Sequence, residues 1–226
     1  WRSIVDSKNY NALYILDNKL KVVGKLENLA PDERVYSVRF MGDTGYFVTF
    51  RQVDPLFAVD LSNPGNPVIL GELKIPGFSE YLHPFADGLL FGLGRDADED
   101  SGKAGFLKLS MFDVSDPTAL SEINKLIIDN VYYSEASYNH KAILINSEKN
   151  IIAFPAEGKY YIYSYSREKG FEQKAIISLA QNGGDYYYYY DMRGLYIGDY
   201  LYVICSSSVS SYSMQTYTLH DTLDLT

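Results

Sequence analysis

The sequence predicts an all-β fold built from repeated four-stranded antiparallel sheets, and three observations support this prediction. A strand ending in an acidic or hydroxyl residue recurs at Asp17, Asp60, Asp113, Ser164 and Ser213, with spacings of 43, 53, 51 and 49 positions. Repeats of this length composed of strands are typical of propeller blades. β-Branched and aromatic residues fill short runs that Gly, Pro, Asn and Asp separate. The chain of 226 residues is 46% hydrophobic, which suffices for a sizeable core. These features predict a β-propeller.

The elements follow from this repeat in chain order. Residues 11–29 supply only the third and fourth strands of a blade, and four complete blades are predicted at about 34–78, 79–130, 134–180 and 191–226. The first complete blade shows the pattern most clearly, with strands predicted over residues 35–40, 46–50, 56–60 and 68–73. No helix of three turns or more is expected between Arg34 and Leu219.

Four blades and a partial blade predict part of a larger propeller. An incomplete blade exposes an unpaired strand edge, and such edges invite association. We expect the missing strands to come from sequence upstream of this chain, from residues 1–10 or from another molecule. As a fragment, the chain is expected to form an open arc or to associate with a second copy.

Composition excludes several classes of partner. The formal net charge is −9, whereas nucleic-acid binding needs a basic face. No apolar run approaches the roughly 18 residues that a membrane-spanning helix needs, so any membrane anchor is expected outside this chain. The single cysteine, Cys205, lies in an apolar run and is interpreted as a packed core thiol.

Several segments resemble one known family. They are 35–43, 50–57, 71–78, 81–84, 94–98, 107–117, 133–136, 140–142 and 195–202. Over nearly its whole length the chain resembles the secreted bacterial proteins with a C-terminal β-propeller domain. The resemblance implies further sequence on the N-terminal side, with an export signal or anchor, and an extracellular or cell-surface location. It implies no particular activity and therefore assigns no catalytic residues. The tyrosine-rich segment 185–191 departs from the family pattern.

Propeller topology predicts which loops gather on one face. Connections from a fourth strand to the next first strand, and from a second to a third strand, emerge on the same side of the disc, and loops on a rigid scaffold often carry function. The candidate ligand-binding residues on these loops are Arg51, Asp54, Glu80, His83, Arg95, Glu135, His140, Tyr187, Tyr189 and Arg193.

An acidic loop on this face suggests calcium. Asp96, Asp98 and Asp100 alternate before a Gly turn, and their carboxylates could converge on one hard cation. A calcium-binding loop of the helix–loop–helix type has Gly at its sixth position and Glu at its twelfth, but this loop has Ser101 and Leu107 there. A solvated acidic hairpin tip is the other interpretation. Calcium is the one cofactor the sequence suggests.

The histidines and tyrosines each allow two interpretations. His83 and His140 follow Glu80 and Glu135 near the expected starts of inner strands, so they could serve as acid and base or bind a metal. The recurrence of Ser-Glu before each histidine favours a structural contact between blades instead. The tyrosine run could stack on sugars or peptides, or it could be a structural or mobile loop that feeds the next inner strand.

Two functions therefore remain open. The first is a non-catalytic extracellular recognition or scaffold domain that displays loops to a protein, glycan or cell-wall partner. The second is a polysaccharide hydrolase or lyase that uses acidic and histidine residues of the loop face. No nucleophile elbow, phosphate loop or paired-cysteine metal site occurs in the sequence, so the first function is favoured.

Overall fold

The computed structural model describes residues 10–50, 54–98, 101–178 and 192–225. The chain divides into two compact units, Trp1–Ile123 and Asn124–Thr226, and each is described here by itself. In the described segments, no helix has the length and apolar character needed to cross a membrane.

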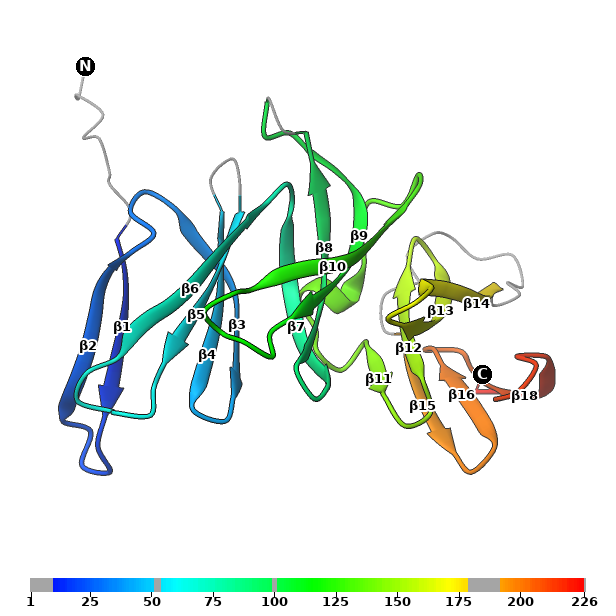
Figure 1. Ribbon diagram of the computed structural model, residues 1–226. Helices are drawn as coiled ribbons and strands as arrows, with labels where there is room; N and C mark the ends of the chain where they lie inside the picture. Colours follow the sequence, from blue (N-terminus) through cyan, green and yellow to red (C-terminus); the bar gives the residue numbers. More distant parts are fainter. Residues whose placement is uncertain (1–9, 51–53, 99–100, 179–191, 226) are drawn as a thin grey trace, which may run out of the picture. The chain divides into compact units, whose positions relative to one another are not determined.

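The first unit contains a two-stranded sheet followed by four-stranded antiparallel sheets (Figure 1). The two-stranded sheet pairs β1 (Asn11–Leu16) with β2 (Val22–Leu29). The next sheet has the order β3 (Arg34–Met41), β4 (Thr44–Phe50), β5 (Asp54–Asp60), β6 (Val68–Ile75). The third comprises β7 (Phe78–Ala86), β8 (Leu89–Ala97), β9 (Ala104–Asp113) and β10 (Ser121–Ile128), and the boundary between the units falls within β10.

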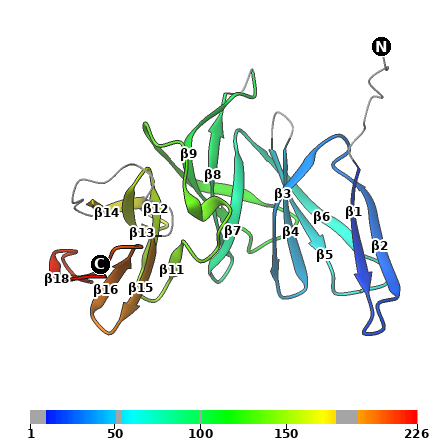
Figure 2. The ribbon, with the colours of Figure 1, turned by 180° about the vertical axis from the view of Figure 1, so that it is seen from behind.

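The second unit contains two further four-stranded sheets (Figure 2). One has the order β11 (Leu144–Asn146), β12 (Ile151–Ala156), β13 (Lys159–Ser166), β14 (Gly170–Ser178). The other has the order β15 (Arg193–Ile197), β16 (Tyr200–Ile204), β17 (Ser208–Ser213), β18 (Leu219–Asp224). A short 3₁₀ helix, η1 (Glu135–Ser137), precedes β11 and is the only helix in the described part of the chain. The predicted all-β architecture of four complete blades and one two-stranded partial blade is confirmed.

In the first three complete sheets, the second and third strands are mostly apolar because both of their faces are covered. On β4 and β5, Tyr46 and Leu56 belong to a core shared with β7–β9. Their chain neighbours Phe47 and Phe57 point to the opposite face and pack with Leu13 and other residues of the two-stranded sheet. Successive side chains of a strand alternate between faces, so a strand between two neighbouring sheets needs apolar residues at every position. This explains the uninterrupted apolar runs of these strands.

The acidic residues that define the repeat terminate strands by forming local turns. The Oδ1 atom of Asp60 accepts a hydrogen bond from the Ser62 backbone N–H at 2.8 Å. Asp113 repeats this contact with the N–H and hydroxyl of Ser115, at 3.0 and 2.6 Å. Asp17 does the same with backbone groups at the end of β1. Side chains of this type replace a backbone partner at a turn, so the recurring aspartates have a structural role.

Neighbouring sheets of the first unit meet at a repeated contact between a glycine and a proline carbonyl. A Cβ atom on Gly24 of β2 would lie 1.9 Å from the Pro64 carbonyl oxygen, and one on Gly71 of β6 would lie 2.4 Å from that of Pro117. Both prolines lie in the turn between the third and fourth strands of the next sheet. Glycine is needed at these positions because the backbone of the next sheet occupies the space of a side chain.

Candidate functional site

The first strand of the third complete sheet is interrupted, and the predicted site residues Glu135 and His140 lie in this interruption. Ser134 pairs with Ala156 of β12, so an unbroken antiparallel register would set Ser137 opposite Ala153. Leu144 stands opposite Ala153 instead, seven positions later. The chain loops out between these points and forms η1. The first strand of the blade predicted at about 134–180 is therefore reduced to the three residues of β11, because the chain leaves the ladder after Ser134.

Ser134 fixes the start of this loop. Its buried hydroxyl donates a hydrogen bond to the Pro155 carbonyl at 2.6 Å and accepts one from the Ala136 N–H at 3.1 Å. The second contact is an N-cap, which satisfies a backbone donor that the short helix leaves without a partner. Ala136 is fully buried, so the loop is anchored by packing as well.

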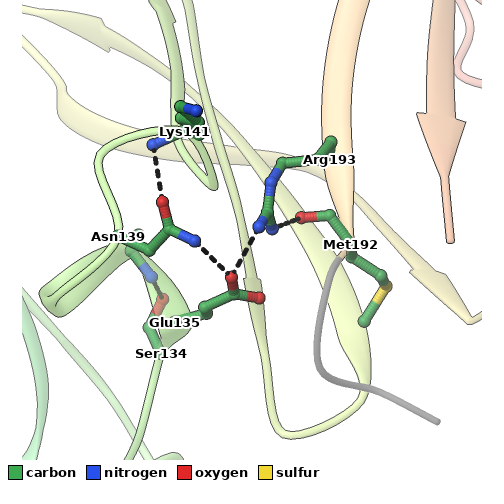
Figure 3. Close-up of polar contacts among 7 residues, drawn as sticks. Ser134, Glu135, Asn139, Lys141, Met192 and Arg193 are labelled. Atoms are coloured by element: carbon green, nitrogen blue, oxygen red, sulfur yellow. Dashed lines mark hydrogen bonds and ion pairs between the residues drawn. The ribbon is translucent and has the colours of Figure 1, made fainter. Parts of the chain in front are cut away.

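Glu135 and Arg193 form the central polar contact of the second unit (Figure 3). The Arg193 Nη2 atom lies 2.8 Å from the Glu135 Oε1 atom, and the Asn139 amide donates to the same oxygen at 2.7 Å. Arg193 also donates to the Met192 carbonyl at 2.8 Å, while the Asn139 Oδ1 atom accepts from the Lys141 N–H at 3.1 Å. The Glu135 side chain is 8% exposed and that of Arg193 26%. This pair joins the looped-out segment to β15 of the neighbouring sheet.

Tyrosines surround this contact along the chain and are open to solvent. Tyr132, Tyr133 and Tyr138 are 44%, 69% and 75% exposed. The Glu157 carboxylate in the turn between β12 and β13 accepts hydrogen bonds from the backbone N–H groups of Tyr132 at 3.0 Å and Tyr133 at 3.4 Å. Exposed aromatic rings are thus displayed on a backbone that is held to the sheet at Glu157 and at Ser134.

His83 belongs to a separate cluster in the first unit. His83 and Tyr81 are neighbours on one side of β7, and the Tyr81 hydroxyl lies 2.9 Å from the His83 Nδ1 atom. Arg39 of β3 lies over the Tyr81 ring at 5.6 Å and donates through Nε to the Leu82 carbonyl at 2.8 Å. Burial, followed by the Arg39 charge, lowers the pKa of His83 below its usual range.

The acid–base interpretation, in which each histidine acts with its preceding glutamate, finds no such contact in the described residues. His83 interacts with Tyr81, and no hydrogen bond or ion pair joins it to Glu80, which is half-buried on β7. His140 is exposed in the loop before β11, and none joins it to Glu135. The structural interpretation accounts better for these residues, since Glu135 contacts Arg193 of the next sheet and the Ser79 carbonyl accepts a hydrogen bond from Ser37 of β3 at 2.7 Å.

The acidic hairpin between β8 and β9 is only partly described. The Asp98 carboxylate accepts hydrogen bonds from the N–H and hydroxyl of Ser101 at 2.8 and 2.7 Å. Arg95 donates to the Gly105 carbonyl at 3.2 and 3.0 Å, across the same hairpin. Asp96 is half-buried on β8, and Asp100 lies outside the described residues. Calcium binding remains a prediction.

Other predicted site residues also fall outside the described part of the chain, namely Arg51, Tyr187 and Tyr189. Asp54 is the first residue of β5, opposite Ile75. Sequence reasoning did not single out Arg39, Tyr81, Asn139, Glu157 or the exposed tyrosines. The signal for the tyrosines was their position in a predicted connecting loop, whereas Arg39 looks like an ordinary strand residue.

Comparisons with known proteins agree with this architecture. The model of the family described as "Beta propeller domain" matches residues 2–217. An uncharacterised protein of Archaeoglobus fulgidus is 45% identical over 207 residues, which are 92% of this chain and 30% of that protein. An uncharacterised protein of Methanocaldococcus jannaschii is 40% identical over 202 residues, which are 89% of this chain and 30% of that protein. The chain thus spans about a third of these relatives. Both are archaeal, whereas the sequence resembled secreted bacterial proteins.

Solved structures show the same fold at low sequence identity. A Lactobacillus plantarum protein has a TM-score of 0.55 at 12% identity, with 97% of this chain and 68% of that chain covered. Apo AztD from Citrobacter koseri has a TM-score of 0.56 at 14% identity, covering 96% and 57%. The Cps50 (Swd1) β-propeller domain of Myceliophteria thermophila has a TM-score of 0.52 at 10% identity, covering 95% and 67%. At these identities the likeness concerns the fold alone.

Proposed function

This chain belongs to the beta propeller domain family, and from that premise we propose that it is a non-catalytic recognition domain. It displays loops to a protein, glycan or cell-wall partner outside the cell or at its surface. The exposed tyrosines on an anchored segment carry this proposal. Tyr132, Tyr133 and Tyr138 offer apolar rings with a polar tip, and such rings suit the faces of sugars and peptides.

The neighbouring charges support binding over acid–base chemistry. A glycosidase needs two carboxyl groups that can reach the scissile bond. The Glu135 carboxylate is almost fully covered and already accepts hydrogen bonds from Asn139 and Arg193. Because the Glu135 carboxylate already accepts these hydrogen bonds, Glu135 acts here as a positioning residue that holds the tyrosine-bearing loop against β15.

A binding screen followed by substitution tests this function. The protein is screened against glycan and peptidoglycan arrays, and each positive ligand is titrated against Tyr133→Ala and Tyr138→Ala variants. Each lost aromatic contact is expected to weaken binding by about 1 kcal/mol, or roughly fivefold. Tyr14→Ala is the matched control, because Tyr14 is 52% exposed on β1 in the other unit.

Two outcomes would contradict the proposal. The first is binding that stays unchanged in the Tyr133 and Tyr138 variants. The second is cleavage of the bound glycan in a product assay, which would instead favour the hydrolase or lyase.

A further inference from the structure

Arg39 is a half-buried cation that has no carboxylate partner in the described part of the chain. It lies on β3, between Val38 and Phe40. Its Nε donates to the Leu82 carbonyl and its guanidinium lies over the Tyr81 ring. A neutral carbonyl does not balance a positive charge, and a charge away from water is stabilised chiefly by an opposite charge.

The tyrosine and histidine beside Arg39 offer a further hydrogen-bond donor. If the Tyr81 hydroxyl donates to His83 Nδ1, the neutral ring carries its proton on Nε2, and that N–H is left to donate elsewhere. If Nδ1 donates to the Tyr81 oxygen, the Tyr81 O–H is left instead. Either arrangement presents one donor to a third group.

We propose that Arg39, Tyr81 and His83 form a binding site for one carboxylate group of a ligand. This inference is independent of the function proposed for the tyrosine-bearing loop, because the two sites lie in different units and share no residue. The three side chains are each partly exposed, so a ligand can reach them. They come from β3 and β7, the first strands of neighbouring sheets, which are also joined by the hydrogen bond from Ser37 to Ser79.

The charges of the site select a carboxylate. Arg39 supplies one positive charge and a planar set of N–H donors that match carboxylate oxygens. The tyrosine–histidine pair adds one neutral donor. A phosphate dianion would keep an unbalanced charge, and a cation would be repelled by Arg39. A single carboxylate therefore neutralises the one positive charge of the site, that of Arg39.

The site is expected to bind more tightly as the pH falls. Tyr81 on the same strand and Arg39 on β3 lie next to His83. Glu80 of β7 makes no hydrogen bond or ion pair with it, β4 carries no charged residue, and Arg95 of β8 pairs with Phe78 at the far end of β7. Burial and Arg39 keep His83 neutral near pH 7. A bound carboxylate favours protonated His83, so by linkage its affinity rises as His83 takes up a proton.

The three histidines of the chain make this measurable by NMR. The ring signals are assigned with His140→Gln and His220→Gln variants, and the pKa of each histidine is followed while sodium D-galacturonate is added at constant ionic strength. The pKa of His83 should rise while those of His140 and His220 stay constant. Methyl D-galactoside, which lacks the carboxylate, should leave all three unchanged. Sodium acetate serves as a further arm, since a response to acetate equal to that with galacturonate identifies the carboxylate alone as the ligand.

Substitutions separate binding from folding. Arg39→Gln should weaken binding of galacturonate by about tenfold or more, and Tyr81→Phe, which keeps the ring, should weaken it less. Arg34→Gln on the same strand is the matched control and should bind as the unsubstituted chain does, because Arg34 is exposed. A melting temperature for each variant shows whether the fold is kept. An unchanged His83 titration with both galacturonate and acetate would overturn the proposal, as would an Arg39→Gln variant that is folded and binds normally.

Discussion

At the scale of single residues, loss of the contact between Glu135 and Arg193 should reduce the stability of the fold most. Removing one member of a covered ion pair leaves the other without its partner, and this costs more than the intact pair contributes. Arg193→Gln is expected to lower the free energy of unfolding by about 1–3 kcal/mol, measured by urea denaturation. Lys25→Gln is the control, because the Lys25–Glu27 pair is exposed and should matter by less than about 1 kcal/mol.

A double-substitution cycle sharpens this prediction. When Glu135→Gln and Arg193→Gln are combined, the loss of stability should be smaller than the sum of the two single losses. Strict additivity would show that the two side chains do not stabilise each other.

The turn aspartates predict a dependence on pH. Hydrogen bonds from the Ser62 backbone N–H and then the Ser62 hydroxyl lower the pKa of Asp60. The contribution is therefore present above the pKa of the unfolded chain and is lost as the pH falls through the lowered pKa of the folded chain. Asp60→Ala should reduce the melting temperature at pH 6 and have a smaller effect at about pH 2. An equal decrease at both values would exclude this role of the carboxylate.

Calcium binding by Asp96, Asp98 and Asp100 gives a third test at this scale. Protein stripped with a chelator should melt at a higher temperature as calcium is added, gaining about 2.7 kcal/mol at a hundredfold excess over Kd. An Asp96→Asn variant should lose this shift. If millimolar calcium leaves the melting temperature of the stripped protein constant, the loop is a solvated hairpin tip.

At the scale of elements, the contacts between sheets depend on glycines, which have no side chain to separate the two backbones. Gly71→Ala would place a methyl group against the Pro117 carbonyl oxygen, and such crowding costs about 1–3 kcal/mol because backbone must move. Gly105→Ala is the matched control, since the nearest atom to its Cβ lies at 3.5 Å. Chemical denaturation of both variants checks the prediction, and equal stability would show that the sheets separate easily.

The elements also show what the sequence could and could not predict. Strands and turns depend on residues close in the chain, so β3–β6 were predicted to within a few residues. The cluster of Arg39 with Tyr81 and His83 was not, because it joins two sheets and no local pattern marks it. Glu135 and Arg193 were both predicted as site residues, but their pairing spans 58 positions and needs the neighbouring sheets in place. The loss of regular pairing after Ser134 was hidden because the intervening residues still read as connection and strand.

At the scale of the whole molecule, the apolar residues left exposed on the first and last sheets of the chain predict further contacts. Tyr14, Leu16 and Val22 of the two-stranded sheet are 49–56% exposed, and Ile197 and Leu223 of the last sheet are 64% and 63% exposed. Exposed apolar patches of this kind mark interfaces. The matching archaeal proteins are about three times as long as the aligned segment, so additional blades are the expected partners of these faces.

Light scattering with this chain and one of the longer archaeal relatives side by side tests that prediction. This chain is expected to associate with itself, and the longer relative to be monomeric if its additional length forms blades that cover the same faces. A monodisperse monomer of the isolated chain, with its first and last sheets paired, would contradict it.

The covering of the middle strands on both faces has a consequence for how the protein can vary. All six residues of β12 are buried, whereas β1 alternates between partly buried and exposed positions. A saturation scan of substitutions should therefore show uniform intolerance along β12 and tolerance at every second position along β1. Substitutions during evolution would be restricted in the same way: the middle strands would keep apolar residues, whereas the turns and outer strands could change.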